Sequence, residues 1–540
     1  MPDILLIQPP IRDFYLTAKR TIPYGLTCIA AALIENGFSV EILDALATSK
    51  ARIRELPKNM AYLRRYYEQP DCSPFALFYA YRHFGYSFEY IGKKAKESGA
   101  FLVGISSLFT PYMRQAVQTA EVVKAHHPDC KIVLGGHHPT ALPQSVMESS
   151  AVDFALRGEG EVSMPLLAGA LSEGGRLDAI PGLVFRRQDG TLHINPAAQM
   201  KEPDAFPLPA VHLVNRQFYR RKQGGSMVIV AGRGCPMQCS YCSVGAQSSL
   251  DYRRRSEKSV IREIEQAVGY GPIGFIDFED ENLALDRRWF LTLLSAIQSR
   301  FGSENIELRA MNGLYPPSLD EAVVRQMKAC GFKTLNLSLG SSSKQQLIRF
   351  NRPDVRDSFD RALDLAEDCG LDAVGYVICA APFQYAADSI SDLLYLAQRR
   401  VLAGLSIFYP APGSRDFDLC KNNGLLPAGF SCLRSSALPL SHTTTRKEAV
   451  TLLRLARILN FMKSLLDQKI PLPGASSAAL SINDPTDRLT TGRQLLSRFL
   501  ADGKIRGITP NGDIFEHHIS ENLSRQFLQG LKSIKIRGSQ

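Results

Sequence analysis

A loop with three closely spaced cysteines constrains this chain more than any other stretch. In the eleven residues Gly-Arg-Gly-Cys-Pro-Met-Gln-Cys-Ser-Tyr-Cys, the cysteines Cys235, Cys239 and Cys242 have the spacing C-x3-C-x2-C. Three thiolates this close together can bind three irons of a cubane 4Fe-4S cluster, and no fourth cysteine follows at ligand spacing. We therefore expect a cluster whose fourth iron stays open to a substrate or a cofactor.

The alternative for these cysteines is a set of structural thiols or half of a zinc site. Structural zinc takes four nitrogen or sulfur ligands, commonly as two C-x2-C pairs, and the sequence contains no second pair. The preceding residues 227–231 are apolar and predict a buried strand. Gly234 and Pro236 favour a curled loop, because glycine tolerates unusual backbone angles and proline ends a helical ladder. The cysteine loop is therefore expected at the carboxyl end of a strand.

The cysteine loop resembles that of the radical S-adenosylmethionine (SAM) superfamily, in which the open iron chelates the amino and carboxylate groups of SAM. That family has an aromatic residue before the third cysteine, where this chain has Tyr241. The resemblance covers about residues 1–425 and implies a 4Fe-4S cluster and SAM as cofactors. It also implies a 5′-deoxyadenosyl radical that abstracts hydrogen, and an electron donor such as flavodoxin or ferredoxin.

Residues 1–200 alternate short apolar strands with amphipathic helices, a pattern typical of an α/β, doubly wound parallel sheet. The expected strands are residues 4–8, 39–43, 101–106, 131–134 and 153–156. The expected helices include 26–36 and 113–126, followed by a hairpin within 180–194. Because ligands of such sheets bind outside the carboxyl ends of the strands, functional residues are expected directly after strands.

Two of these strand ends resemble the slot that takes the nucleotide tail in Rossmann-like cobalamin-binding domains. Ser106-Ser-Leu108 matches the S-x-L element and Gly135-Gly136 matches the G-G element, whose missing side chains let a ligand lie against the backbone. The third element, D-x-H-x-x-G after the first strand, is absent, so no histidine ligand to cobalt is expected. The resemblance implies cobalamin contacts by Ser106, Leu108, Gly135, Gly136, Thr140 and Glu159. The alternative is a flavodoxin-like domain that has lost its cofactor and only covers the barrel.

From residue 227 the alternation of strands and helices resumes, and with the resemblance it predicts a partial (β/α)6 barrel of the TIM type. Its six strands are expected at 227–231, from 273, and at 306–311, 334–339, 373–379 and 404–409. Carboxylates at the end of the second strand stand where barrel enzymes keep functional groups, and they suit a cationic amine. The resemblance implies SAM contacts by Tyr241, Glu279, Asp280, Asn312, Ser338, Arg352 and Ile378. For Arg352 the alternative is an exposed arginine with no ligand.

The remaining segments are expected to connect or cover these two domains. Residues 201–226 contain three prolines and read as a linker to the barrel at 227–425. Residues 426–540 are expected to form a mainly helical region on the substrate side, with a long helix at 445–466. Residues 51–97 are predicted to form helices over the cofactor or substrate mouth, with a plain packing insert as the alternative.

Length, charge and cysteine content indicate the number of domains, the kind of partner and the cellular compartment to expect. A length of 540 residues suggests two large domains and an appendage. The formal net charge of +10 is spread along the chain, which favours a solvated basic surface over an acidic partner, and no nucleic-acid module is apparent. The sequence shows neither a signal peptide nor a membrane span. Eleven cysteines without a disulfide framework indicate a reducing cytoplasm.

In the cobalamin-dependent part of the superfamily, a methyl group carried on cobalt is most often transferred to a substrate radical, and another SAM restores methylcobalamin. The resemblance therefore implies a cobalamin-dependent radical SAM methyltransferase that acts on an unactivated position of a small-molecule, lipid or peptide intermediate. One alternative is a related enzyme that performs cyclisation, oxidation or rearrangement without methyl transfer. Another is a non-catalytic cobalamin or redox sensor.

Overall fold

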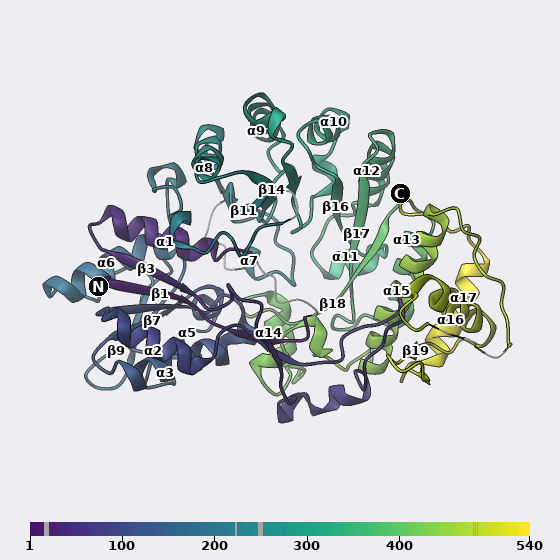
Figure 1. Cartoon of the computed structure of the whole chain (residues 1–540), viewed down its shortest axis with the longest axis horizontal. Coiled ribbons are helices and arrows are strands. Elements are labelled where there is room, and N and C mark those ends of the chain that lie inside the picture. The colour runs from purple at the N-terminus through teal and green to yellow at the C-terminus, as the bar shows by residue number, and fades with distance from the viewer. Residues whose placement is uncertain (16–20, 222–223, 247–251, 479, 481, 483) are drawn as a thin grey trace.

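The computed structural model describes residues 1–15, 21–221, 224–246, 252–478, 480, 482 and 484–540. Figure 1 shows a sheet domain at the left, barrel strands with outer helices across the upper centre, and carboxyl-terminal helices at the right. The sheet of the first domain has the order β10-β9-β8-β7-β6-β1-β3. Its strands are β1 (Ile4–Gln8), β3 (Val40–Asp44), β6 (Leu102–Ser106), β7 (Lys131–Gly135), β8 (Phe154–Leu156), β9 (Leu183–Arg186) and β10 (Leu192–Ile194).

Strand β1 shows why this sheet is covered on both faces. Its alternate residues Ile4 and Leu6 belong to one apolar cluster, and Leu5 and Ile7 to another, because successive side chains of a strand point to opposite faces. Helices α1 (Tyr24–Glu35) and α6 (Gly160–Glu173) cover the first face, and α2 (Phe88–Ser98) and α3 (Met113–His126) cover the second. The parallel strands β3, β1, β6, β7 and β8 therefore form the predicted doubly wound sheet. The chain order switches beside β1, and the ligand edge of such sheets lies at the carboxyl ends of the strands there.

The predicted six strands of the partial barrel are all present. They are β11 (Gly225–Ile229), β14 (Ile273–Phe278), β15 (Glu307–Arg309), β16 (Thr334–Gly340), β17 (Asp372–Cys379) and β18 (Leu402–Ile407). They pair in parallel as two groups of three, and single bridges such as Leu314 to Leu337 join the groups. Helices α8 (Glu257–Gly269), α9 (Arg287–Phe301), α10 (Glu321–Ala329), α12 (Arg356–Asp368) and α13 (Ala386–Ala397) lie outside the strands (Figure 1).

The helices predicted for residues 51–97 are wrong for most of that segment. Only α2 is an α-helix; the rest contains β4 (Ala51–Ile53), a 3-10 turn from Lys58 to Arg65 and β5 (Arg82–Phe84), which pairs between β2 (Ile11–Asp13) and β4. Three prolines in 57–74 prevent a continuous helix, and the aromatic side chains fold inward instead. The insert contacts the carboxyl-terminal region, since Tyr67 donates from its hydroxyl to the carbonyl of Ser436 at 2.9 Å.

The carboxyl-terminal region is mainly helical, as predicted, and also contains a hairpin. Its main elements are α15 (Arg446–Asp467), α16 (Arg488–Asp502), β19 (Arg506–Ile508), β20 (Ile514–Glu516) and α17 (Glu521–Lys532). Asn460 of α15 bonds both the amide and the carbonyl of Ala403 in β18, at 2.8 and 2.9 Å. This contact covers the free edge of the last barrel strand, which otherwise exposes unpaired backbone groups.

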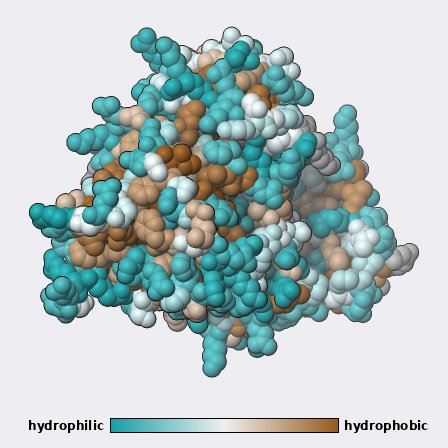
Figure 2. Space-filling model, turned by 60° about the vertical axis from the view of Figure 1, so that its left-hand side comes forward, coloured by the Kyte–Doolittle hydropathy of each residue, from teal (hydrophilic) through white to brown (hydrophobic). Residues whose placement is uncertain are grey.

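The outer surface mixes hydrophilic and apolar side chains. Figure 2 shows one face on which brown apolar side chains form a band within a mostly teal surface. Within the part of the chain that the structure describes, none of the helices combines the length and apolar character that crossing a membrane requires.

Candidate functional site

The cysteine loop begins and ends at a short two-stranded ribbon. Strand β12 (Gly232–Arg233) pairs antiparallel with β13 (Arg253–Arg254), and we call these two strands the neck of the cluster loop. The chain leaves the neck through Gly234, whose φ of +80° is a left-handed conformation that favours glycine. Cys235 follows at once, and a short helix, α7 (Ser243–Ala246), follows Cys242. The loop therefore lies just beyond the carboxyl end of β11, where the sequence predicts it.

Side chains and backbone from two helix ends hold the loop between its cysteines. The backbone N–H of Ser240 donates to the carbonyl of Phe350 at 2.9 Å, directly after α11 (Lys344–Arg349). The hydroxyl of Ser240 donates to Asp416 at 3.0 Å, in the first turn of α14 (Arg415–Asn422). Asn351 donates from its amide to the carbonyl of Gln238 at 2.7 Å. These contacts hold the loop in place by its residues Gln238 and Ser240, which lie between the cysteines and are not cluster ligands.

The three cysteines are close enough to affect one another electrostatically. Burial raises the pKa of Cys235, and the neighbouring Cys242 and Cys239 raise it further. Among the described residues, no three Cys, His, Asp or Glu side chains stand together as a set of metal ligands. The donor set itself fits an iron cluster, because three thiols on one loop supply the sulfur ligands that iron-sulfur clusters use.

Asp280 braces the start of the cluster loop from the end of β14. Its carboxylate accepts hydrogen bonds from the backbone N–H groups of Ala231 at 3.1 Å and Gly232 at 2.5 Å. Burial raises the pKa of Asp280 to about 7, although these two amides lower it. The sequence assigned Asp280 to SAM, and that contact stays a prediction. The bracing contact was not foreseen, because sequence does not show which amides lie opposite a carboxylate.

Three of the residues expected to contact SAM lie together. Arg352 donates to the hydroxyl of Tyr241 at 2.9 Å and to the hydroxyl of Ser338 at 2.8 Å. Its Nε is buried and has no hydrogen-bond partner among the described residues. The alternative of an exposed, idle arginine is therefore wrong, since Arg352 is only partly exposed and joins the fourth strand to the cysteine loop. An unpaired buried N–H next to the cluster loop fits a carboxylate such as that of SAM.

The other expected SAM residues form two smaller groups. Asn312 donates from its amide to the carbonyl of Glu279 at 2.9 Å, so the ends of β14 and β15 meet. Burial, then Asp277, raises the pKa of Glu279. Ile378 packs near Tyr241 in an apolar cluster with Phe350. Their contact with SAM stays a prediction, but all lie at the same end of the barrel.

The strand ends assigned to cobalamin lie side by side. Ser106 of β6 is the register partner of Gly135 of β7. A Cβ at Gly135 would meet nothing within 4 Å, whereas one at Gly136, whose φ is +120°, would lie 2.7 Å from the carbonyl oxygen of Ser107. The hydroxyl of Ser107 is buried and has no partner among the described residues. Open space at one glycine and an unpaired hydroxyl beside it fit a bound ligand tail.

Other residues assigned to cobalamin support this strand edge. Thr140 donates from its hydroxyl to the carbonyl of Gly136 at 2.8 Å and accepts from the N–H of Gly158 at 2.9 Å. Leu108 is 42% exposed at the same edge. Glu159 uses its carboxylate on Arg253 and Arg233 of the neck, so its contact with cobalamin stays a prediction.

His138 lies in the short helix α4 (His137–Ala141), where its ring nitrogens are occupied by side chains of the fold. It is fully buried, and its ring nitrogens lie 3.2 Å from the hydroxyl of Thr110 and 2.8 Å from that of Ser145. Burial lowers its pKa to about 4. Both nitrogens thus have partners within the fold, and the ring stays neutral at neutral pH.

Sequence reasoning missed a buried contact between the loop after β1 and the carboxyl-terminal region. Arg434 forms an ion pair with Asp13 at 3.0 Å, and the hydroxyl of Tyr112 donates to the same carboxylate. Both charged side chains are at most 7% exposed. Asp13 ends β2, in the segment where the D-x-H-x-x-G element is absent from this sequence, and its partner lies more than 400 residues away. No local pattern signals such a pair.

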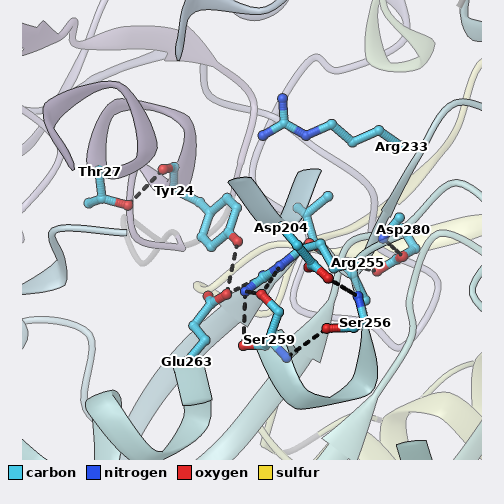
Figure 3. A network of polar contacts seen from close by, with 12 residues as sticks. Tyr24, Thr27, Asp204, Arg233, Arg255, Ser256, Ser259, Glu263 and Asp280 are labelled. Atoms are coloured by element: carbon cyan, nitrogen blue, oxygen red, sulfur yellow. Dashed lines mark hydrogen bonds and ion pairs between the residues drawn. The ribbon is translucent and has the colours of Figure 1, made fainter. Parts of the chain in front are cut away.

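Figure 3 shows polar contacts that join the sheet domain and the linker to the barrel near the start of the cluster loop. Tyr24 of α1 donates to Glu263 of α8 at 3.4 Å, and Arg255 also donates to Glu263. Asp204 of the linker accepts from the backbone N–H of Ser256 at 3.0 Å. A cavity of about 40 Å³ lies beside these residues. The two domains are therefore in direct polar contact beside the cluster loop.

Comparisons with known proteins agree with this geometry. The family model described as B12 binding domain matches residues 17–168, and the one described as Radical SAM superfamily matches residues 229–388. An uncharacterized methyltransferase of Pyrococcus horikoshii is 26% identical over 342 residues, which are 63% of this chain and 73% of that protein. The cytidylyl-2-hydroxyethylphosphonate methyltransferase of Streptomyces wedmorensis is 25% identical over 396 residues, which are 65% of this chain and 70% of that protein.

A solved structure shares the fold. The radical SAM methyltransferase TsrM of Kitasatospora setae, with cobalamin and a 4Fe-4S cluster bound, superposes with a TM-score of 0.58 at 18% identity. The match covers 78% of this chain and 75% of that one. The B12-binding match includes Ser106, Gly135 and Thr140, and the radical SAM match includes the three cysteines. The chain belongs to the radical SAM superfamily, in the subfamily with an amino-terminal cobalamin-binding domain.

Proposed function

We propose that this protein is a cobalamin-dependent radical SAM methyltransferase that methylates an unactivated position of a small-molecule, lipid or peptide intermediate. The observation that carries the proposal is the direct contact between elements of the two expected cofactor sites. Glu159, one of the residues assigned to cobalamin, forms an ion pair with Arg233 at 3.3 Å, and Arg233 lies two residues before Cys235. The two expected cofactor sites therefore lie on elements that touch.

The protein supplies binding and orientation in this proposal. When bound, the cluster with SAM supplies a hydrogen-abstracting radical, and cobalamin supplies a methyl group. Cys235, Cys239 and Cys242 would hold the cluster. Arg352 would orient SAM, because its Nε is buried without a partner among the described residues. Its planar guanidinium suits a carboxylate.

The sheet domain would hold cobalamin at the carboxyl ends of β6 and β7. Gly135 leaves space for the tail, and the unpaired hydroxyl of Ser107 offers a hydrogen bond to it. Leu108 and Phe109 are 42% and 54% exposed at this edge, and Tyr409, just after barrel strand β18, is 44% exposed. Exposed apolar side chains of this kind mark a binding region and exclude water once a ligand covers them.

The relatives named as methyltransferases support methylation over other radical outcomes. No disulfide joins any two of the eleven cysteines, all of which lie among the described residues, and this fits a reducing cytoplasm in which a donor such as flavodoxin or ferredoxin reduces the cluster. The proposed substrate class is a small-molecule, lipid or peptide intermediate.

The test uses reconstituted protein, added cobalamin and SAM labelled in its methyl group, under anaerobic reduction. We expect 5′-deoxyadenosine to form and label to reach the bound corrinoid. Formation of 5′-deoxyadenosine without label on the corrinoid would favour a cyclase, oxidase or rearrangement enzyme. A loaded cluster that yields neither would favour a sensor. Cys239→Ala is the control, because loss of one of three ligands should abolish both signals.

A further inference from the structure

The neck of the cluster loop is joined to the cobalamin-binding domain by buried ion pairs. Arg233 of β12 contacts Glu159 at 3.3 Å and also donates to Glu161. Arg253 of β13, the register partner of Arg233, holds the two oxygens of Glu159 at 2.9 and 3.0 Å. Two neighbouring arginines of one ribbon therefore meet two carboxylates of the other domain.

These ion pairs are largely shielded from water on the side of the carboxylates. The side chains of Glu159 and Glu161 are 9% and 8% exposed and that of Arg253 is 10% exposed, whereas that of Arg233 is 26% exposed. Two positive charges face two negative charges, so the contact is balanced as it stands. Surface ion pairs constrain little, but removal of one partner from a buried pair leaves a charge without compensation. The network therefore fixes the position of the neck relative to the cobalamin-binding domain, in addition to attracting the two.

Each end of the network leads to a cofactor site. Arg233 is separated from Cys235 by Gly234 alone. On the other side, Glu159 directly follows Gly158, whose N–H donates to the hydroxyl of Thr140 at 2.9 Å. Thr140 in turn donates to the carbonyl of Gly136, in the glycine pair of the cobalamin slot. A continuous chain of contacts thus runs from the slot to the first cysteine of the loop.

We propose that Arg233, held by Glu159 and Glu161, is a positioning residue that sets the cluster loop relative to the cobalamin-binding domain. The inference rests on the proposed function, since it concerns the relative position of that function's two metal cofactors. Transfer between two groups depends steeply on their separation and alignment. A small shift of the loop should therefore lower methyl transfer more than it lowers 5′-deoxyadenosine formation or cobalamin binding.

The test compares Arg233→Gln and Glu161→Gln with Arg254→Gln. Arg254 follows Arg253 in the same ribbon, but it pairs at 2.8 Å with Asp286, the N-cap of the outer helix α9, and not with the cobalamin-binding domain. It therefore controls for damage to the neck. Glu161→Gln changes the network from the other domain and leaves the loop sequence intact, which covers the case that Arg233→Gln fails to fold or to bind iron.

The main readout is electron paramagnetic resonance of protein that contains both the reduced cluster and cob(II)alamin. The magnetic interaction between these two spins reports their separation. We expect it to change in both network variants and to match wild type in Arg254→Gln, while iron content and cobalamin binding stay near wild type. The double variant should add little to either single one, because both remove the same contact.

A second readout is label transferred to the corrinoid per 5′-deoxyadenosine formed. We expect this ratio to fall roughly tenfold or more in the network variants. An unchanged spin interaction in Glu161→Gln with full loading of both cofactors would overturn the positioning role. Failure of the wild type to transfer label would refute the proposed function but not the positioning role of Arg233, because the spin interaction is measured without turnover.

Discussion

Gly232 donates its backbone N–H to the buried carboxylate of Asp280 at 2.5 Å, three residues before the first cysteine of the cluster loop. The neighbouring amide of Ala231 donates to the other oxygen of the same carboxylate. One side chain at the end of β14 therefore satisfies two buried donors where the chain leaves β11. The end of β11, which precedes the cysteines, is thus fixed to the end of the neighbouring barrel strand β14.

We expect Asp280→Ala to loosen the start of the cluster loop. The change leaves two buried amides without a partner, which costs about 1–3 kcal/mol each in free energy of unfolding. Iron content after reconstitution should fall, and the decay of cluster absorbance should be faster. Asp280→Asn keeps one acceptor and should be intermediate. Asp178→Ala breaks an exposed ion pair and should leave the cluster unaffected. Wild-type iron content in Asp280→Ala would contradict the bracing role.

Gly135 and Gly136 should respond differently to substitution, although they are adjacent. Gly135→Leu places a side chain in open space, so we expect cobalamin binding to be lost while the melting temperature stays near wild type. Gly136→Ala forces a Cβ against the backbone of Ser107 at a φ of +120°, so we expect a lower melting temperature. The measurements are corrinoid absorbance after gel filtration and thermal melts. Full cobalamin binding by Gly135→Leu would show that the slot lies elsewhere.

The sequence was most informative where the functional residues lie close together along the chain. The spacing of Cys235, Cys239 and Cys242 and the glycine pair at the end of β7 are local patterns, and the alternation of strands with helices correctly indicated both the sheet and the barrel. The partners of these residues are not local. Asp13 meets Arg434 and Glu161 meets Arg233 only because separate domains pack together, and single-sequence patterns carry no information on such pairs.

Residues 51–85 show a second reason for failure. Aromatic and apolar residues in this insert suggested helices, but three prolines interrupt the segment. Its aromatic rings then pack against Phe14, for example Tyr81 at a centroid distance of 5.2 Å. Tertiary packing overrides local preference in such segments, and the periodicity that marks a helix is absent there.

Arg352→Lys should weaken SAM binding more than it affects the cluster. The guanidinium reaches Tyr241 and Ser338 at once and still leaves its Nε unpaired among the described residues, a geometry that a single ammonium cannot reproduce. We expect the dissociation constant for SAM to rise by roughly tenfold, the equivalent of about 1–2 kcal/mol for a charged hydrogen bond. Equilibrium binding to the reconstituted protein provides the measurement.

The matched control for that change is Arg349→Lys, near the same turn of chain. Arg349 ends α11 and is exposed, and its side chain donates only to the carbonyl of Phe383 at 2.7 Å among its described contacts. Iron content should equal wild type in both variants. A rise in the dissociation constant that is the same for both would indicate a general disturbance of α11 rather than a SAM contact.

Acid should destabilise the fold through His138. Burial lowers the pKa of His138 to about 4, so the folded protein keeps the ring neutral while the unfolded chain takes up a proton near pH 6.5. The stabilisation is therefore complete above about pH 6.5 and is lost as the pH falls toward 4, by roughly 3 kcal/mol in all. We expect the urea midpoint of the protein without cofactors to fall between pH 7.5 and pH 5.

His138→Gln should remove this part of the pH dependence, because glutamine can bond Thr110 and Ser145 without titrating. The variant should be less stable than wild type at pH 7.5, since its side chain fits the ring site poorly, yet lose less stability between pH 7.5 and pH 5. His212→Gln, at an exposed position, should keep the wild-type slope. If His138→Gln also kept that slope, the acid sensitivity would come from other groups and not from protonation of His138.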